Sequence, residues 1–198
     1  IITESDDVGF SKNGQAPFGK EKEASARFAL EIGILCNDAH IEHESEALER
    51  RIVAGNPTER ALVFAAHTIG LTRRELSERY PRLDTVPFDS ERKYMVTLHG
   101  QEHGDHMVLA KGAPEKILAA STTFDRNGAH HRMTDERRYE LLKTSERMSR
   151  EGLRVIAIAH RHVARETRAL AALGDPLNDL IFVGLLGLKD PLREGAKD

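Results

Sequence analysis

The chain has 198 residues, of which 39% are hydrophobic and 31% charged, a composition that excludes a disordered chain and suffices for a hydrophobic core. Its 29 basic and 32 acidic residues give a net charge of −3 and form no basic stripe, so we expect no nucleic-acid partner. The longest apolar run, residues 180–188, is too short to span a membrane. The single cysteine, Cys36, excludes an internal disulfide and favours a reducing compartment.

The first half of the chain is predicted to be mainly helical. Residues 1–22 are polar and carry turn signals, which fit a short strand, a loop or a poorly ordered terminus. Apolar residues recur at helical spacing over residues 23–41, and we expect Cys36 to be a small buried side chain among them. Asn56 is expected to cap a second helix that ends near residue 70, and Thr72 a third that ends near residue 79.

The second half alternates strands with helices. Three β-like stretches come first, and the Gly-rich polar link between the second and third predicts a hairpin. The expected strands are residues 83–88, 94–99, 107–110, 153–159 and 181–188, and the expected helices are residues 114–120 and 135–150. We therefore predict a single α/β domain of the α+β type, in which helices flank a mostly antiparallel twisted sheet.

Motifs for common ligand sites are absent or ambiguous. The chain has neither the phosphate loop GxxxxGK(S/T) nor GxGxxG after a strand. Residues 174–179, GDPLND, look like an acidic metal loop, but the proline and the position before a strand favour a turn. Ten histidines suggest metal binding, yet we expect His99, His103 and His106 at a hairpin tip where nothing fixes their rings. A solvated loop is therefore preferred to a metal site.

Two short stretches carry residues that local structure does not explain. In KGAPEK, residues 111–116, the glycine and proline suit a turn into a helix, but Lys111 has no local role. A cation at a strand end, beside the amides of a helix start, suits an anion or a nucleotide. In PFDSERK, Phe88 fits either an aromatic at the rim of the core or a platform on which a base stacks, with Lys93 available for phosphates.

Five separated motifs together resemble one family. They are GNPTERAL at 55–62, PFDSERKYM at 87–95, KGAPE at 111–115, GLRVIAIA at 152–159 and DPLR at 190–193. In this order they resemble the nucleotide-binding (N) domain of P-type cation-transporting ATPases, nearest the calcium-pump-like branch. The resemblance covers nearly the whole chain and is weaker in its first twenty or so residues and in residues 121–150. It implies the N-domain fold for residues 1–189 and, for residues 190–198, the hinge that returns to a phosphorylation domain.

The resemblance implies an ATP site. Phe88 matches the aromatic that stacks on adenine, Glu59 the acid near the adenine amino group, and Lys111 the lysine that lines the adenosine pocket. The ATP-binding residues implied in this way are Thr58, Glu59, Phe88, Lys93, Lys111, Gly112 and Arg154. Lys93 and Arg154 match the basic residues that reach toward ribose and phosphates.

The hinge motif adds two residues near the phosphates. Asp190 and Arg193 match the hinge of the family, and Arg193 is basic enough to visit the phosphates in a closed pump. The sequence departs from the family at Asn56, where the family usually has Asp, and at Leu192, where the hinge often has a second Pro. Asn and Asp both cap helices, so the first departure changes only the local charge.

The family's catalytic motifs are absent from the chain. It contains neither DKTGT, which holds the phosphorylated aspartate, nor TGD, nor GDGxND. We therefore expect a fragment that binds ATP, as Mg-ATP in the intact pump, with no catalytic residue and no metal site of its own. Hydrolysis coupled to transport would belong to the intact pump. The resemblance implies a monomeric cytoplasmic domain of an integral membrane protein, with no membrane insertion of its own and with the phosphorylation and actuator domains of the same chain as partners.

Two other interpretations stay open. One is a non-catalytic protein-binding or regulatory module whose nucleotide pocket is vestigial, and the other is a metal-binding histidine protein. The presence of Phe88, Lys93, Lys111 and Arg154 favours the ATP-binding domain, because a degenerate pocket would have lost some of these residues.

Overall fold

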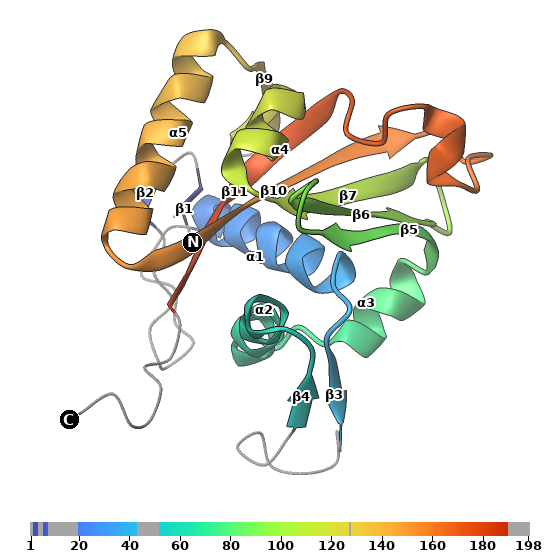
Figure 1. The fold of residues 1–198 in the computed structure, drawn as a ribbon. Helices are drawn as coiled ribbons and strands as arrows, with labels where there is room; N and C mark the ends of the chain where they lie inside the picture. Colours follow the sequence, from blue (N-terminus) through green and yellow to red (C-terminus); the bar gives the residue numbers. More distant parts are fainter. Residues whose placement is uncertain (1, 4–5, 8–19, 43–51, 127, 190–198) are drawn as a thin grey trace.

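A twisted antiparallel sheet forms the centre of the computed structural model, which describes residues 2–3, 6–7, 20–42, 52–126 and 128–189 (Figure 1). Its main path runs in the order β2-β1-β11-β10-β7-β6-β5, and β8 and β9 extend it from β11. All neighbours pair antiparallel except β11 and β8, which are parallel. The strands are β1 (Ile2–Thr3), β2 (Asp6–Asp7), β5 (Arg82–Asp89), β6 (Tyr94–His99), β7 (His106–Gly112), β8 (Ser121–Arg126), β9 (Ala129–Arg132), β10 (Leu153–Val163) and β11 (Leu180–Lys189).

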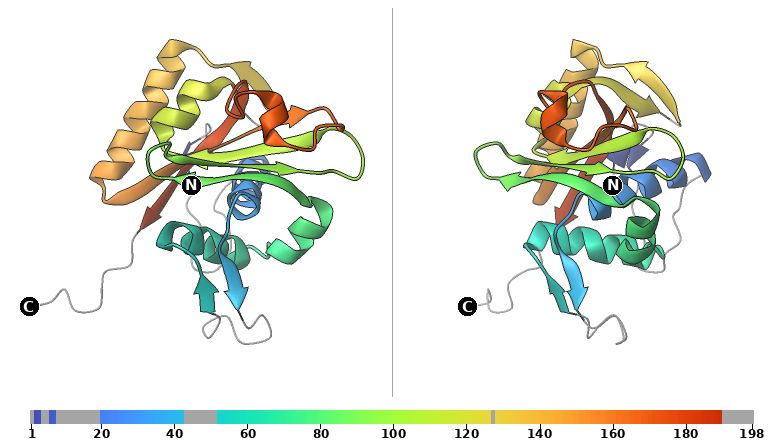
Figure 2. Two further views of the ribbon diagram at one scale, coloured as in Figure 1. Left: turned by 45° about the vertical axis from the view of Figure 1, so that its right-hand side comes forward. Right: turned by 90° about the vertical axis from the view of Figure 1, so that its right-hand side faces the viewer.

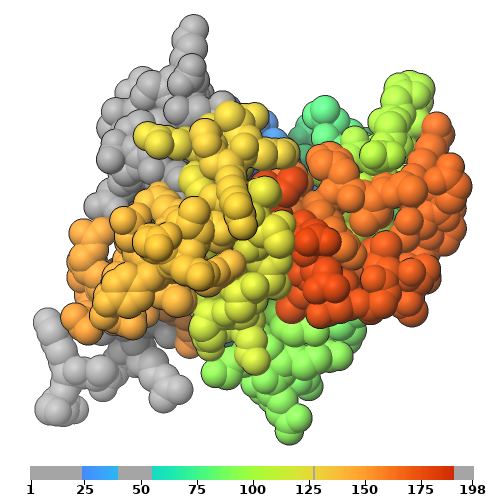
Figure 3. Space-filling view, turned by 90° about the horizontal axis from the view of Figure 1, so that it is seen from above, coloured from blue at the N-terminus to red at the C-terminus, as the bar shows by residue number. Residues whose placement is uncertain are grey.

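Helices cover both faces of this sheet. On one face lies α1 with α2 and α3 beyond it, and on the other lie α4 and α5, as the side views show (Figure 2). Figure 3 looks onto the face that α4 and α5 cover. The helices are α1 (Lys20–Leu35), α2 (Pro57–Thr68), α3 (Arg73–Arg79), α4 (Pro114–Ala120) and α5 (Asp135–Arg150). The predicted α+β fold with a mostly antiparallel sheet is confirmed.

Two hydrophobic cores result from the alternation of side chains along the strands. Met95 and Leu109 point toward α1, α2 and α3 and belong to one core. Their neighbours Val96 and Val108 point to the opposite face and pack in the core beneath α4 and α5. Successive residues of a strand face opposite sides of the sheet, so strands buried on both faces are continuously apolar.

Side-chain caps begin three of the helices where the sequence predicts. The side chain of Asn56 accepts a hydrogen bond from the backbone N–H of Glu59 at the start of α2. Thr72 accepts one from Glu75 at the start of α3, and Thr134 caps α5 in the same way. Because each cap satisfies an amide that the helix itself leaves unpaired, short polar residues at these positions are reliable start signals.

The first helix ends earlier than predicted. Apolar spacing suggests a helix as far as residue 41, but α1 ends at Leu35. The reason is Asn37, whose buried amide donates to the carbonyls of Gly33 and Glu59, both at 3.1 Å, while its oxygen accepts from the N–H of Ala39. These bonds replace the helical pattern, and the chain continues into β3 (His40–Glu42), which pairs with β4 (Ile52–Ala54).

The prediction that nothing fixes the histidine rings near the β6–β7 hairpin is wrong for two of the three. The His99 ring is buried and has one nitrogen 2.9 Å from the Tyr80 carbonyl and the other 2.9 Å from the Thr97 hydroxyl. Burial, the largest effect, lowers its pKa to about 4. His106 is buried as well, and only His103 is exposed.

The acidic stretch before β11 is a turn, as predicted. The N–H of Leu177 donates to the side chain of Asp175, and the N–H of Asn178 donates to its carbonyl. Within the described ranges, no group of three or more His, Cys, Asp or Glu side chains is arranged to hold a metal ion.

Candidate functional site

A cavity of about 520 Å³ opens where α2 begins, β5 ends, β6 begins, β7 ends and β10 begins. This volume is in the range that small-molecule ligands occupy. It brings together all of the residues for which the sequence implies a role in ATP binding. Its lining consists of Asn56, Thr58, Glu59, Phe88, Lys93, Lys111, Gly112, Ala113, Arg154, Val155 and Ile156.

A buried ion pair forms part of the cavity wall. The Nζ atom of Lys111 lies 2.8 Å from Oε1 of Glu59, and both side chains are less than one-tenth exposed. The same oxygen accepts a hydrogen bond from the N–H of Asp38 at 3.3 Å. Glu59 is held by the first turn of α2 and Lys111 by the centre of the sheet, so the wall carries paired charges in fixed positions.

Phe88 contributes a large exposed aromatic ring. Its side chain is 54% exposed although it lines the cavity, and within the described part of the chain only Tyr139 is another exposed large hydrophobic residue. The next residue, Asp89, fixes the turn after Phe88 by accepting from the N–H groups of Glu91 and Arg92. The bond from Arg92 is the main cause that lowers the pKa of the Asp89 carboxyl. Phe88 is therefore a surface aromatic near the end of β5, just before a defined turn, and the interpretation as a rim aromatic of the core does not fit its exposure.

Two cations stand beside the opening. Lys93 has a left-handed backbone, with φ of 63°, and its Nζ lies 3.4 Å from the Glu115 carboxylate. Both side chains of that pair are about half exposed, which makes it a weak, solvated interaction. Arg154, at the start of β10, donates from Nη1 to the hydroxyl of Thr58 at 3.0 Å. Two positively charged side chains, Lys93 and Arg154, therefore lie at the solvent-exposed edge of the cavity.

Gly112 is required by close backbone packing. It pairs with Tyr94 of β6 and with Ala157 of β10. A Cβ atom at this position would lie 2.6 Å from the carbonyl oxygen of Lys93 and 2.7 Å from Cβ of Tyr94. The glycine therefore lets β6 and β7 approach at the base of the cavity.

Sequence reasoning missed some lining residues and named others that the structure does not describe. Asn56 was interpreted only as a helix cap, and Val155 and Ile156 only as strand residues, although all three lie within the recognised motifs. Asp190 and Arg193 lie outside the described residues, so their predicted place near the phosphates and the domain boundary at residue 189 stay predictions.

Comparison with known proteins decides the family. Residues 26–195 match the family described as P-type ATPase, cytoplasmic domain N. The chain belongs to this family.

The relatives of this N domain are named calcium-transporting or cation-transporting ATPases. It is 34% identical over 172 residues to calcium-transporting ATPase 1 of Bacillus cereus, covering 87% of the chain and 18% of that protein. It is 36% identical over 168 residues to the cation-transporting ATPase pma1 of Synechocystis, covering 84% and 18%. It is 31% identical over 198 residues to the probable cation-transporting ATPase F of Mycobacterium tuberculosis, covering 96% and 20%. The chain spans about a fifth of the length of these relatives. None of the N-domain helices described is long and apolar enough to cross a membrane.

Proposed function

We propose that this N domain binds ATP in the cavity beside Phe88 and presents the γ-phosphate to the aspartate of a phosphorylation domain in a cation-transporting P-type ATPase. The observation that carries the proposal is the convergence of an aromatic ring, a buried carboxylate and several cations on one cavity of about 520 Å³. These groups come from α2, β5, the turn after β5, β7 and β10, and so from segments spread over much of the sequence, Thr58 and Arg154 being 96 residues apart.

The base end of ATP fits the inner part of the cavity. Adenine stacks on Phe88, and stacking of a base on an aromatic side chain is worth about 1–3 kcal/mol. Both hydrogen bonds described for the Glu59 carboxylate, from Lys111 and Asp38, go to Oε1. Its second oxygen can therefore accept from the exocyclic amino group of adenine, while Lys111 keeps the carboxylate in place.

The phosphate end fits the opening. Lys93 and Arg154 can each turn a charged group toward the triphosphate, because both side chains are exposed where they line the cavity. Magnesium in Mg-ATP would be carried by the phosphates, because the cavity lining contains a single carboxylate, Glu59, which is already paired. The chain lacks the DKTGT motif, so it binds ATP without hydrolysing it.

The experiment is an ATP titration of the 198-residue chain followed by amide chemical shifts. We expect a dissociation constant in the high micromolar to millimolar range, about −4 to −6 kcal/mol, since one stacked base and a solvated triphosphate give little binding energy. Phe88→Ala should weaken binding by roughly five- to a hundredfold, from the loss of stacking. Tyr139→Ala, which removes the other exposed large hydrophobic side chain among the residues described, on α5, is the matched control and should bind as the parent does.

Two outcomes would count against the proposal. If a folded Phe88→Ala variant bound ATP with parental affinity, adenine would not stack on this ring. Absence of any shift at the cavity amides in the parent would leave a protein-binding or regulatory module with a vestigial pocket as the better interpretation.

A further inference from the structure

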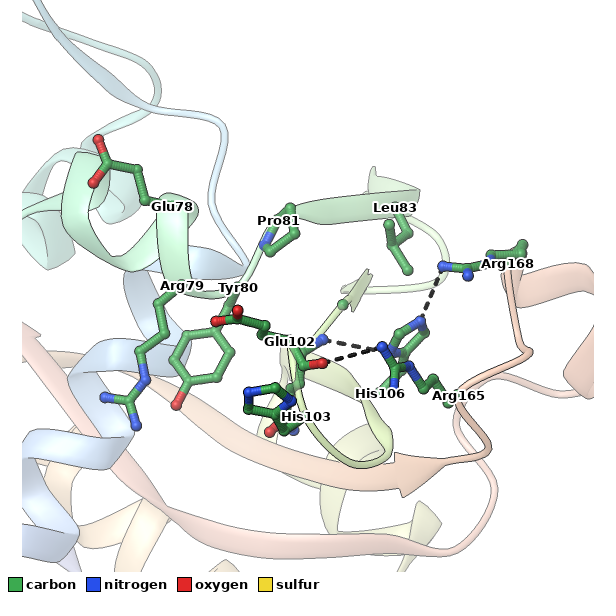
Figure 4. A pocket seen from close by; sticks show the side chains of 12 residues that line it. Glu78, Arg79, Tyr80, Pro81, Leu83, Glu102, His103, His106, Arg165 and Arg168 are labelled. Atoms are coloured by element: carbon green, nitrogen blue, oxygen red, sulfur yellow. Dashed lines mark hydrogen bonds between the residues drawn. The ribbon is translucent and has the colours of Figure 1, made fainter.

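A second cavity lies at the other end of the β6–β7 pair, in the region that Figure 4 shows. Its volume is about 510 Å³, close to that of the nucleotide cavity. β7 begins here at His106 and ends at the nucleotide cavity with Lys111 and Gly112. A strand rises about 3.4 Å per residue, so the five residues from His106 to Lys111 separate the two cavities by roughly 17 Å.

Two guanidinium groups converge on one side of this cavity. Arg165 donates to the carbonyl of Glu102 at 3.1 Å, and Nη1 of Arg168 lies 3.2 Å from Nε2 of His106 (Figure 4). Among the described residues, neither Arg165 nor Arg168 forms an ion pair with a carboxylate. By contrast, Arg82 at the start of β5 is bound to Asp38 at 2.7 Å. Neither guanidinium group in the cavity is therefore neutralised by a direct ion pair with a described carboxylate.

Two N–H donors face the His106 ring, which can accept a hydrogen bond from only one of them. Its Nδ1 faces the N–H of Gln101 at 3.4 Å, and its Nε2 faces Arg168. A neutral imidazole accepts at one nitrogen only, and a protonated one accepts at neither. One of these two donors is therefore left without an acceptor at the ring. Oxygen atoms of an anion would supply it.

Carboxylates among the described residues lie near the two arginines without forming ion pairs with them. Glu78 and Glu102 line the cavity, and Asp105 and Glu166 lie close enough to act on His106. Burial lowers the pKa of His106, Arg168 and Arg165 lower it further, and the opposing effects of the two carboxylates are smaller. The two arginines therefore affect the His106 pKa more than these two carboxylates do.

Part of the remaining lining is apolar or aromatic. Pro81, Leu83 and Gly100 border the cavity, and Tyr80 carries the Arg79 guanidinium 5.0 Å from its ring centroid. A ligand that fits such a lining has an anionic group for the arginines and a carbon body for the apolar side. We propose that this cavity binds a small organic anion, a carboxylate or phosphate ester with a short apolar or aromatic body, held by Arg165 and Arg168.

The test uses simple probes on the 198-residue chain, followed by amide shifts. Phenyl phosphate and benzoate present both parts of the proposed ligand, inorganic phosphate only the anion, and phenol only the ring. We expect phenyl phosphate or benzoate to shift the amides of Gln101, His106 and Arg168 with a millimolar dissociation constant, inorganic phosphate to bind several-fold more weakly, and phenol to cause no shift. Which of the two organic probes binds more tightly distinguishes a phosphate ester from a carboxylate.

A charge variant gives the decisive comparison. Arg165→Gln/Arg168→Gln should weaken organic-anion binding at least tenfold while leaving ATP-induced shifts at Gly112 unchanged. Both arginines are exposed, so the double variant should fold, which circular dichroism would verify. Arg150→Gln, which removes a guanidinium that is 81% exposed at the end of α5, is the matched control and should bind as the parent does.

Four results would overturn the proposal. Equal weakening by Arg150→Gln would show only attraction to overall surface charge. Equal shifts with phenol would show an apolar pocket without anion recognition. Shifts confined to the nucleotide cavity, or their absence from the parent at tens of millimolar probe, would show that this cavity takes no such ligand. None of these results depends on whether ATP binds at the other end of β7.

Discussion

The buried Glu59–Lys111 pair allows a sharp stability prediction. The two charged atoms lie 2.8 Å apart and both side chains are nearly excluded from water. Removing one partner of such a pair leaves an uncompensated buried charge, which typically costs about 3–5 kcal/mol. Because domains of this kind are stable by only about 5–15 kcal/mol, Lys111→Met or Glu59→Gln alone should remove a large part of the free energy of unfolding.

The double variant should be less unstable than the sum of the single ones. In Glu59→Gln/Lys111→Met no charge remains buried, the methionine keeps most of the lysine stem, and the glutamine oxygen can still accept from the N–H of Asp38. We expect a coupling free energy of about 1–3 kcal/mol between the two substitutions, as for residues in direct contact. Urea unfolding of the parent, both single variants and the double variant measures it.

A second lysine–glutamate pair serves as the control. Lys93 and Glu115 lie 3.4 Å apart but are each about half exposed. The same substitutions there should cause little loss of stability and little coupling, because solvent screens exposed pairs. If the Glu59 and Lys111 variants were as stable as the Lys93 and Glu115 variants, or if their effects simply added, the argument from burial would be refuted.

Three further predictions concern pH, packing and the phosphate end. Burial, and then the nearby His162 and His130, lower the pKa of His160 from 6.5 to about 4, so the unfolded chain binds more protons than the folded one between these values. Stability should therefore fall as pH drops from 6.5 to 4, by up to about 3 kcal/mol for this residue, and His160→Phe should make urea unfolding less dependent on pH in that window. Gly112→Ala should weaken ATP binding and lower the melting temperature, because its Cβ would overlap the Lys93 carbonyl, whereas the strand-end control Gly100→Ala has ordinary contacts and should be tolerated. Arg154→Ala should weaken ATP binding more than AMP binding in parallel titrations, and equal losses would place this arginine at the part that AMP shares with ATP rather than at the β- and γ-phosphates.

Elements with local start signals could be predicted from the sequence. The helices after Asn56, Thr72 and Thr134 begin where a short polar side chain can cap them, and the buried strands β10 and β11 are continuous apolar runs. The strand pair β8 and β9 was missed because it is polar and partly exposed, and β8 is fixed by parallel pairing with the distant β11. Pairing between strands that are distant in the chain leaves no local pattern in the sequence from which it could be predicted.

For the candidate site too, local features could be predicted from the sequence and tertiary contacts could not. Short motifs indicated which residues belong together, because each motif combines turn or cap residues with charged or aromatic ones. They could not indicate that Glu59 and Lys111, 52 residues apart, form a buried pair. Nor could they reveal the second cavity, since Arg165 and Arg168 follow β10 and meet His106 only through the pairing of β10 with β7.

The double variant also tests why a buried pair is present at all. Replacing a buried ion pair by residues of similar volume is often neutral or stabilising, so stability alone does not explain one. If Glu59 and Lys111 read the base of ATP, the double variant should lose less stability than the two single variants together and still bind ATP at least tenfold more weakly than the parent. The measurement is an ATP titration without urea, under conditions in which the double variant is fully folded. A stable double variant with parental affinity would assign the pair to the packing of α2 against the sheet and leave Phe88 as the main contact with the base.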